Sequence, residues 1–66
     1  MIVFLTEEEL IEKIKEDGLA LQYADEELQD DKEVVLTAVK KDGRALQFAS
    51  DRLRNDEELI KIASKH

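Results

Sequence analysis

An internal repeat of 25 residues constrains the fold more than any other feature of this sequence. When residues 17–41 are aligned with residues 42–66, 11 of the 25 positions are identical. A fixed period of this length is typical of arrays in which each helical unit buries its apolar face against the next. We therefore predict an all-α fold, a short helical repeat array with repeats of about 25 residues. The identities concentrate at turns and apolar positions and include Asp17/Asp42, Gly18/Gly43, Ala20/Ala45, Leu21/Leu46, Leu28/Leu53 and Asp31/Asp56.

Start and stop signals predict three longer helices alternating with two short helices. Thr6 is followed three residues later by Glu9, a capping box that satisfies the free amides at a helix start. Gly18 and Gly43 follow the first two longer helices, and we expect each to end its helix in the left-handed conformation. The longer helices are expected at 7–16, 32–41 and 57–64, and the short helices at 19–24 and 44–49, with capped single turns anchored by Leu28 and Leu53.

The repeat boundaries divide one domain, residues 1–66, into three parts. These are an N-terminal capping segment and half-repeat at 1–17, a central repeat at 18–42 and a C-terminal repeat at 43–66.

The differences between the copies predict which helix faces meet within the stack. The middle helix carries a wide apolar stripe that includes Val34, Leu36, Ala38 and Val39. The outer helices have each lost a different half of it, so we infer that positions 34 and 38 face the preceding repeat and positions 36 and 39 the following one. Terminal repeats need polar outer faces, which predicts a finished unit. The polar replacements are Glu9 and Lys13 in the first helix and Lys61 and Ser64 in the last.

Composition excludes several classes of function. The net charge of −7 argues against sequence-independent binding of nucleic acid or of an anionic membrane, since both attract lysine and arginine. The chain lacks cysteine, and no stretch approaches the roughly 20 apolar residues that span a membrane. The initial MIVFL lacks the basic flank and cleavage site of a secretion signal, so we expect a cytoplasmic protein.

The sequence predicts no catalytic, cofactor-binding or metal-binding residues, and we expect neither an enzyme nor a small-molecule substrate. His66 is the only histidine and is the last residue, where fraying would prevent precise positioning. An alternative is a weak divalent-metal site on the acidic loop Asp25 to Glu33. An EF-hand loop beginning at Asp25 would require a glycine and a glutamate where the chain has Asp30 and Leu36.

Partner recognition is the function class that remains. Ile2, Phe4 and Ile62 are difficult to bury within one unit, and if exposed together they form a patch for a partner protein or a second copy. The alternative is that the N-terminal segment folds over the first helices. Tyr23 and Phe48 occupy equivalent positions and are expected in the core. We thus predict a noncatalytic helical repeat module, a scaffold or protein-interaction unit; a designed or excised repeat unit selected only for folding is the other reading.

One combination of residues resembles a known family. The pattern Asp31-x-Glu33-Val34-Val35-Leu36-x-Ala38-Val39, Asp42-Gly43-x-Ala45-Leu46-x-Phe48-Ala49-Ser50 and Leu53-x-Asn55-Asp56 is similar to the tandem helical repeat called domain of unknown function 4116. The resemblance covers residues 6–66 and implies an all-α repeat that occurs in several copies within larger proteins. It implies no activity and no catalytic residues. The chain departs from the pattern in its polar end helices and at Asp25, where the family has the serine seen at Ser50.

Overall fold

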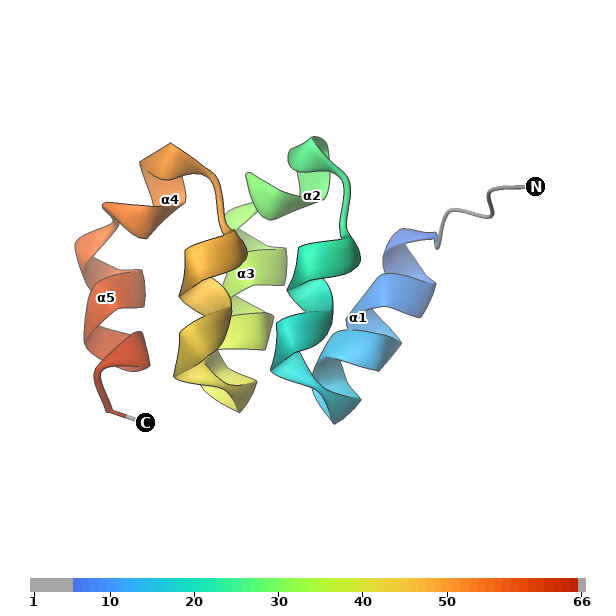
Figure 1. The fold of residues 1–66 in the computed structure, drawn as a ribbon, viewed down its shortest axis with the longest axis horizontal. Helices are drawn as coiled ribbons and strands as arrows, with labels where there is room; N and C mark the ends of the chain where they lie inside the picture. The colour runs from blue at the N-terminus through green and yellow to red at the C-terminus, as the bar shows by residue number, and fades with distance from the viewer. Residues whose placement is uncertain (1–5, 66) are drawn as a thin grey trace.

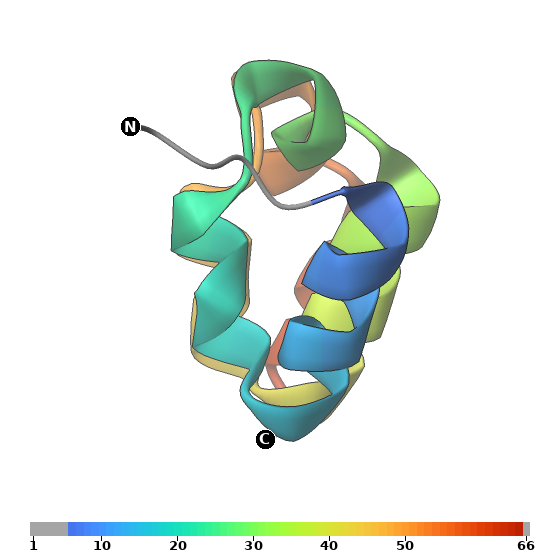
Figure 2. The same cartoon turned by 90° about the vertical axis from the view of Figure 1, so that its right-hand side faces the viewer.

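Two layers of helices, stacked side by side along one axis, form residues 6–65, the part of the chain that the computed structural model describes (Figure 1). The longer helices α1, α3 and α5 make one layer, and the 3₁₀ helices η1 and η2 make the other, as the view along the stack in Figure 2 shows. The predicted all-α array is confirmed, and the single turns α2 and α4 join its layers at one edge. The segments are α1 (Glu7–Glu16), η1 (Gly18–Tyr23), α2 (Glu26–Gln29), α3 (Lys32–Lys41), η2 (Gly43–Phe48), α4 (Asp51–Arg54) and α5 (Glu57–Ala63).

A side-chain cap begins each of these segments. The predicted capping box is confirmed: Thr6 Oγ1 accepts from the Glu9 amide at 3.1 Å, and the Glu9 carboxylate accepts from the Thr6 amide at 3.4 Å. Such caps each contribute about 1 kcal/mol. Five of the 17 acidic residues are therefore N-caps. After Thr6, the capping residues are Asp17, Asp25, Asp31, Asp42, Ser50 and Asp56.

The two glycines are required for close packing, and the predicted left-handed conformation is wrong. Neither glycine has a positive φ, and each begins a 3₁₀ helix. A Cβ atom on Gly18 would lie 2.5 Å from the carbonyl oxygen of Ala38, and one on Gly43 would lie 2.5 Å from that of Ala63. Each 3₁₀ helix thus touches the backbone of the next longer helix, which excludes any side chain there.

The core runs through the middle of the stack. Helix α3 buries Val34, Val35, Ala38 and Val39, whereas α5 buries only Leu59. Gly18 contacts Ala38, and Gly43 contacts Ala63. These contacts confirm that the repeat position of residues 38 and 63 faces the preceding repeat. Among residues 6–65, no polar or charged residue is buried, so packing rests on aliphatic contacts. The outer-face residues Glu9, Lys13, Lys61 and Ser64 are exposed, as expected.

The two aromatic residues at the equivalent repeat position behave differently. Phe48 packs against the core, but Tyr23 is 75% exposed, so its predicted burial is wrong. A buried tyrosine needs a hydrogen-bond partner for its hydroxyl, a requirement that phenylalanine does not have. The exposed position leaves the phenol hydroxyl of Tyr23 in contact with water.

Candidate functional site

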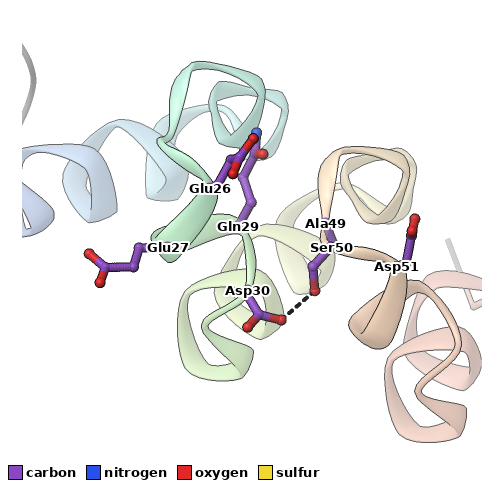
Figure 3. A pocket seen from close by; sticks show the side chains of 7 residues that line it. All are labelled: Glu26, Glu27, Gln29, Asp30, Ala49, Ser50 and Asp51. Carbon is purple, nitrogen blue, oxygen red and sulfur yellow. Dashed lines mark hydrogen bonds between the residues drawn. The ribbon is translucent and has the colours of Figure 1, made fainter.

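A hollow of about 590 Å³ lies between the single turns α2 and α4, where the central and C-terminal repeats meet (Figure 3). It is open to solvent, and carboxylates make up most of its polar groups. Both turns lie on the same edge of the molecule (Figure 1), and each begins with a side-chain cap. The lining residues are Glu26, Glu27, Gln29, Asp30, Ala49, Ser50 and Asp51.

The floor of the hollow is a polar joint between repeats. Ser50 Oγ donates to Asp30 Oδ1 at 2.6 Å, the hydrogen bond drawn in Figure 3, and the Ser50 amide donates to the Gln29 carbonyl at 2.9 Å. Arg52 closes the joint by donating to Asp30 Oδ1 at 3.1 Å and to the Asp30 carbonyl oxygen at 2.8 Å. The Ser50 hydroxyl, followed by the Arg52 guanidinium, holds the pKa of Asp30 below its usual range. The bonds of Asp30 thus hold α2 against α4.

The joint also explains why the two repeats differ at their α2 and α4 caps. Ser50 accepts from the Leu53 amide at 3.3 Å while it donates to Asp30, so its hydroxyl serves both bonds. Asp25 caps α2 in the same way but, as a carboxylate, cannot donate. In the sequence the residue 25 positions before Asp30 is Leu5, which offers no carboxylate to accept a second bond. The departure from the family pattern at Asp25 therefore coincides with a leucine at the repeat position that Asp30 occupies in the next copy.

Glu26 and Glu27 stand apart from this joint. Both are exposed in the first turn of α2, and Figure 3 shows the Glu27 side chain pointing away from Ser50. Within residues 6–65, no lysine or arginine forms a salt bridge with either carboxylate. These two negative charges are free to meet a positively charged group from outside.

The acidic loop Asp25 to Glu33 offers no assembled metal site. Asp25 caps α2, Asp31 accepts from the Glu33 amide at 3.0 Å, and Asp30 is held by Ser50 and Arg52. Across the part of the chain that the structure describes, no three acidic or histidine side chains lie close enough to share an ion. Capping and joining account for the aspartates of this loop.

A second joint links α3 to α5. Lys32 Nζ lies 3.1 Å from Asp56 Oδ2 and 2.9 Å from Glu58 Oε1. Lys32 is the largest cause of the lowered pKa of Asp56, and Glu58, followed by Asp56, raises the pKa of Lys32. Because Asp56 also caps α5, this joint fixes the start of the last helix against the preceding repeat.

Of the three predicted partner-binding residues, the described one, Ile62, does not line the hollow. Ile62 is half-buried at the edge of the core, and Ile2 and Phe4 fall outside the described residues. The patch of these three residues therefore stays a prediction. Sequence reasoning did not find the hollow, because Asp30 and Ser50 are 20 residues apart and only the stacking of repeats brings them together.

Asp30→Asn should make stability less sensitive to acid. Because the pKa of Asp30 is lower in the folded than in the unfolded chain, its carboxylate stabilises the fold above the unfolded pKa. That contribution is lost as the pH falls through the folded pKa. Urea unfolding from about pH 6 to about pH 2 should therefore show a shallower fall in the free energy of unfolding for the variant. Ser50→Ala, which keeps the carboxylate but loses the hydroxyl, should give an intermediate slope. Equal slopes for all three proteins would contradict the joint.

The comparisons with known proteins agree with this repeat architecture. A model described as Domain of unknown function (DUF4116) matches the chain twice, over residues 7–48 and 31–66. The first match begins at the start of α1 and the second at the cap of α3, so both begin at a longer helix. No curated protein and no solved structure shows a significant match. No helix within residues 6–65 is long and apolar enough to cross a membrane. Since the two matches together cover nearly the whole sequence, the chain belongs to the family Domain of unknown function (DUF4116).

Proposed function

We propose that the chain is a noncatalytic helical repeat module that binds a protein partner through the hollow between α2 and α4. The observation that carries this proposal is the pair of exposed carboxylates of Glu26 and Glu27 beside an open hollow with the Ala49 side chain in its lining. Such a surface suits a partner segment that combines lysine or arginine with a small apolar contact.

Two further observations support a binding role. The bonds of Asp30 with Ser50 and Arg52 hold α2 against α4, so the hollow between these turns is already formed before a partner arrives. Tyr23 is largely exposed and ends η1 two residues before the cap of α2. Aromatic residues are enriched among those that dominate the energy of protein interfaces. The chain thus carries a charged surface and an exposed aromatic on consecutive segments.

The proposal is tested by neutralising the two carboxylates. In the cells that produce the protein, a crosslinkable chain should form an adduct with a partner, and Glu26→Gln with Glu27→Gln should reduce that adduct at least several-fold. Raising the salt concentration should reduce it as well, because screening weakens exposed charge pairs.

The matched control is Glu7→Gln with Glu8→Gln. These carboxylates occupy the first turn of α1 as Glu26 and Glu27 occupy that of α2, so both pairs change the same charge beside a helix N-terminus. The control should keep the adduct. Loss of the adduct in both variants would show that net charge alone matters, and no adduct with the unmodified chain would refute the proposal.

A further inference from the structure

A second open hollow, of about 290 Å³, lies between the C-terminal halves of α1 and α3. Its lining consists of three lysines and one threonine, and we call it the lysine groove: Lys15, Thr37, Lys40 and Lys41. The Thr37 hydroxyl is already used, because it donates to the Glu33 carbonyl oxygen at 3.0 Å. The charged groups that line the groove are therefore all ammonium groups.

Two of these lysines have no internal partner. Within residues 6–65, neither Lys40 nor Lys41 forms a salt bridge, and both side chains are exposed. Lys15 lies 3.7 Å from Glu12, an exposed pair of the kind that contributes little. A lysine in the last turn of a helix complements the helix dipole, which accounts for each lysine by itself. It does not account for lysines of two helices lining one hollow.

The lysine groove and the hollow between α2 and α4 lie on opposite edges of the molecule. Helix α3 begins beside α2 and ends at the other edge, where α1 ends as well (Figure 1). In that direction the molecule measures 22 Å, which exceeds the roughly 8 Å over which charges act at physiological salt. The acidic edge therefore does not mask the positive charge of the groove, although the net charge is −7.

The hollow between α2 and α4 offers the charge that complements the groove. Glu26 and Glu27 are exposed and, within the described part of the chain, form no salt bridge, as is true of Lys40 and Lys41. Each copy carries one surface of each sign on opposite edges, so a second copy in the same orientation brings the two surfaces together. A free groove and a free hollow then remain at the two ends of the pair.

We propose that the lysine groove binds the hollow between α2 and α4 of a second copy of this chain. The inference rests on the proposed function, because it names the partner of the hollow. The contact joins the edges of two stacks and does not extend the array of repeats along its axis. Copies add head to tail, since each contact uses one groove and one hollow.

The test combines two neutralised variants, each of which keeps one of the two surfaces. Glu26→Gln with Glu27→Gln keeps the groove, and Lys40→Gln with Lys41→Gln keeps the hollow. In sedimentation velocity, the average mass of the unmodified chain should rise with protein concentration and fall as salt is added. Each variant alone should associate at least several-fold more weakly. An equimolar mixture of the two should regain association but stop at a dimer, because each member has only one surface left.

NMR of the same mixture locates the contact. With the glutamine variant of residues 26 and 27 labelled with ¹⁵N, we expect saturable shifts of the amides of Thr37 and Lys40. With the variant of residues 40 and 41 labelled instead, the shifts should move to the amides of Glu26 and Ala49. A mixture that associates no more strongly than either variant alone, or shifts in only one of the two surfaces, would overturn the inference.

Lys61→Gln with Lys65→Gln is the matched control, because it removes the same charge from two exposed lysines outside the groove. The control should associate like the unmodified chain, and an equal loss would overturn the inference by showing that net charge alone matters. A chain that stays monomeric while its cellular adduct contains a different protein would overturn this inference and leave the proposed function standing. Self-association in solution without any adduct in cells would support the contact and refute the proposed function.

Discussion

Gly18→Ala should lower the free energy of unfolding by about 2–3 kcal/mol. The new methyl group would meet the Ala38 carbonyl oxygen at 2.5 Å and Asp42 Cβ at 3.1 Å. The first of these atoms belongs to the backbone of α3, which cannot move without disturbing the middle of the core. Urea denaturation at neutral pH measures the change. A domain of this size has little stability to spare, so the variant should also melt several degrees earlier.

Gly18→Asn separates the two explanations for this glycine. If the residue were needed for a left-handed cap, asparagine would be tolerated better than alanine, because asparagine adopts that conformation readily. If close packing is the reason, asparagine should destabilise at least as much as alanine, because it adds more atoms to the same contact. Arg44→Ala provides the control, because Arg44 is an exposed residue of a 3₁₀ helix. Apart from the loss of its surface ion pair with Asp42, this change should alter the free energy of unfolding by less than about 0.5 kcal/mol.

How much could be predicted from the sequence depends on how many positions separate the interacting residues along the chain. The caps at Thr6, Asp31 and Asp56 depend on residues two or three positions apart, so local spacing was sufficient to place them. The apolar stripe of α3 was likewise readable from its period, and its loss from the outer helices identified the middle of the stack. The longer helices α1 and α3 consequently have the predicted bounds.

What could not be predicted depends on contacts between repeats. The close approach of Gly18 to Ala38 joins residues 20 positions apart, and the sequence offered a local explanation, the left-handed cap, that turned out to be wrong. The joint between Asp30 and Ser50 has the same separation and was likewise hidden. Tyr23 shows the limit of repeat equivalence, since it is 75% exposed although the equivalent Phe48 packs against the core.

Leu53→Ala should cost about 2–5 kcal/mol, enough to unfold much of a small domain at room temperature. Leu53 is fully buried in α4 and belongs to the core cluster, and its removal leaves a cavity beneath the turn that contacts both η2 and α5. Leu28→Ala is the matched control, because Leu28 occupies the equivalent position of α2 but is only half-buried. The control should lose distinctly less stability in urea denaturation, and equal losses would contradict the burial seen for these leucines.

The stability lost in Leu53→Ala should be lost first near the substitution, because each repeat packs only on its neighbours in the stack. Helix α5 packs on α3, η2 and α4, whereas α1 packs on η1 and α3, so a cavity at Leu53 acts first on the C-terminal repeat. In such arrays stability is approximately the sum of unit and nearest-neighbour terms. Amide hydrogen exchange of Leu53→Ala should therefore show the amides of α5 losing protection before those of α1 and η1. Uniform loss along the chain would instead show that 66 residues are too few for the repeats to open one at a time.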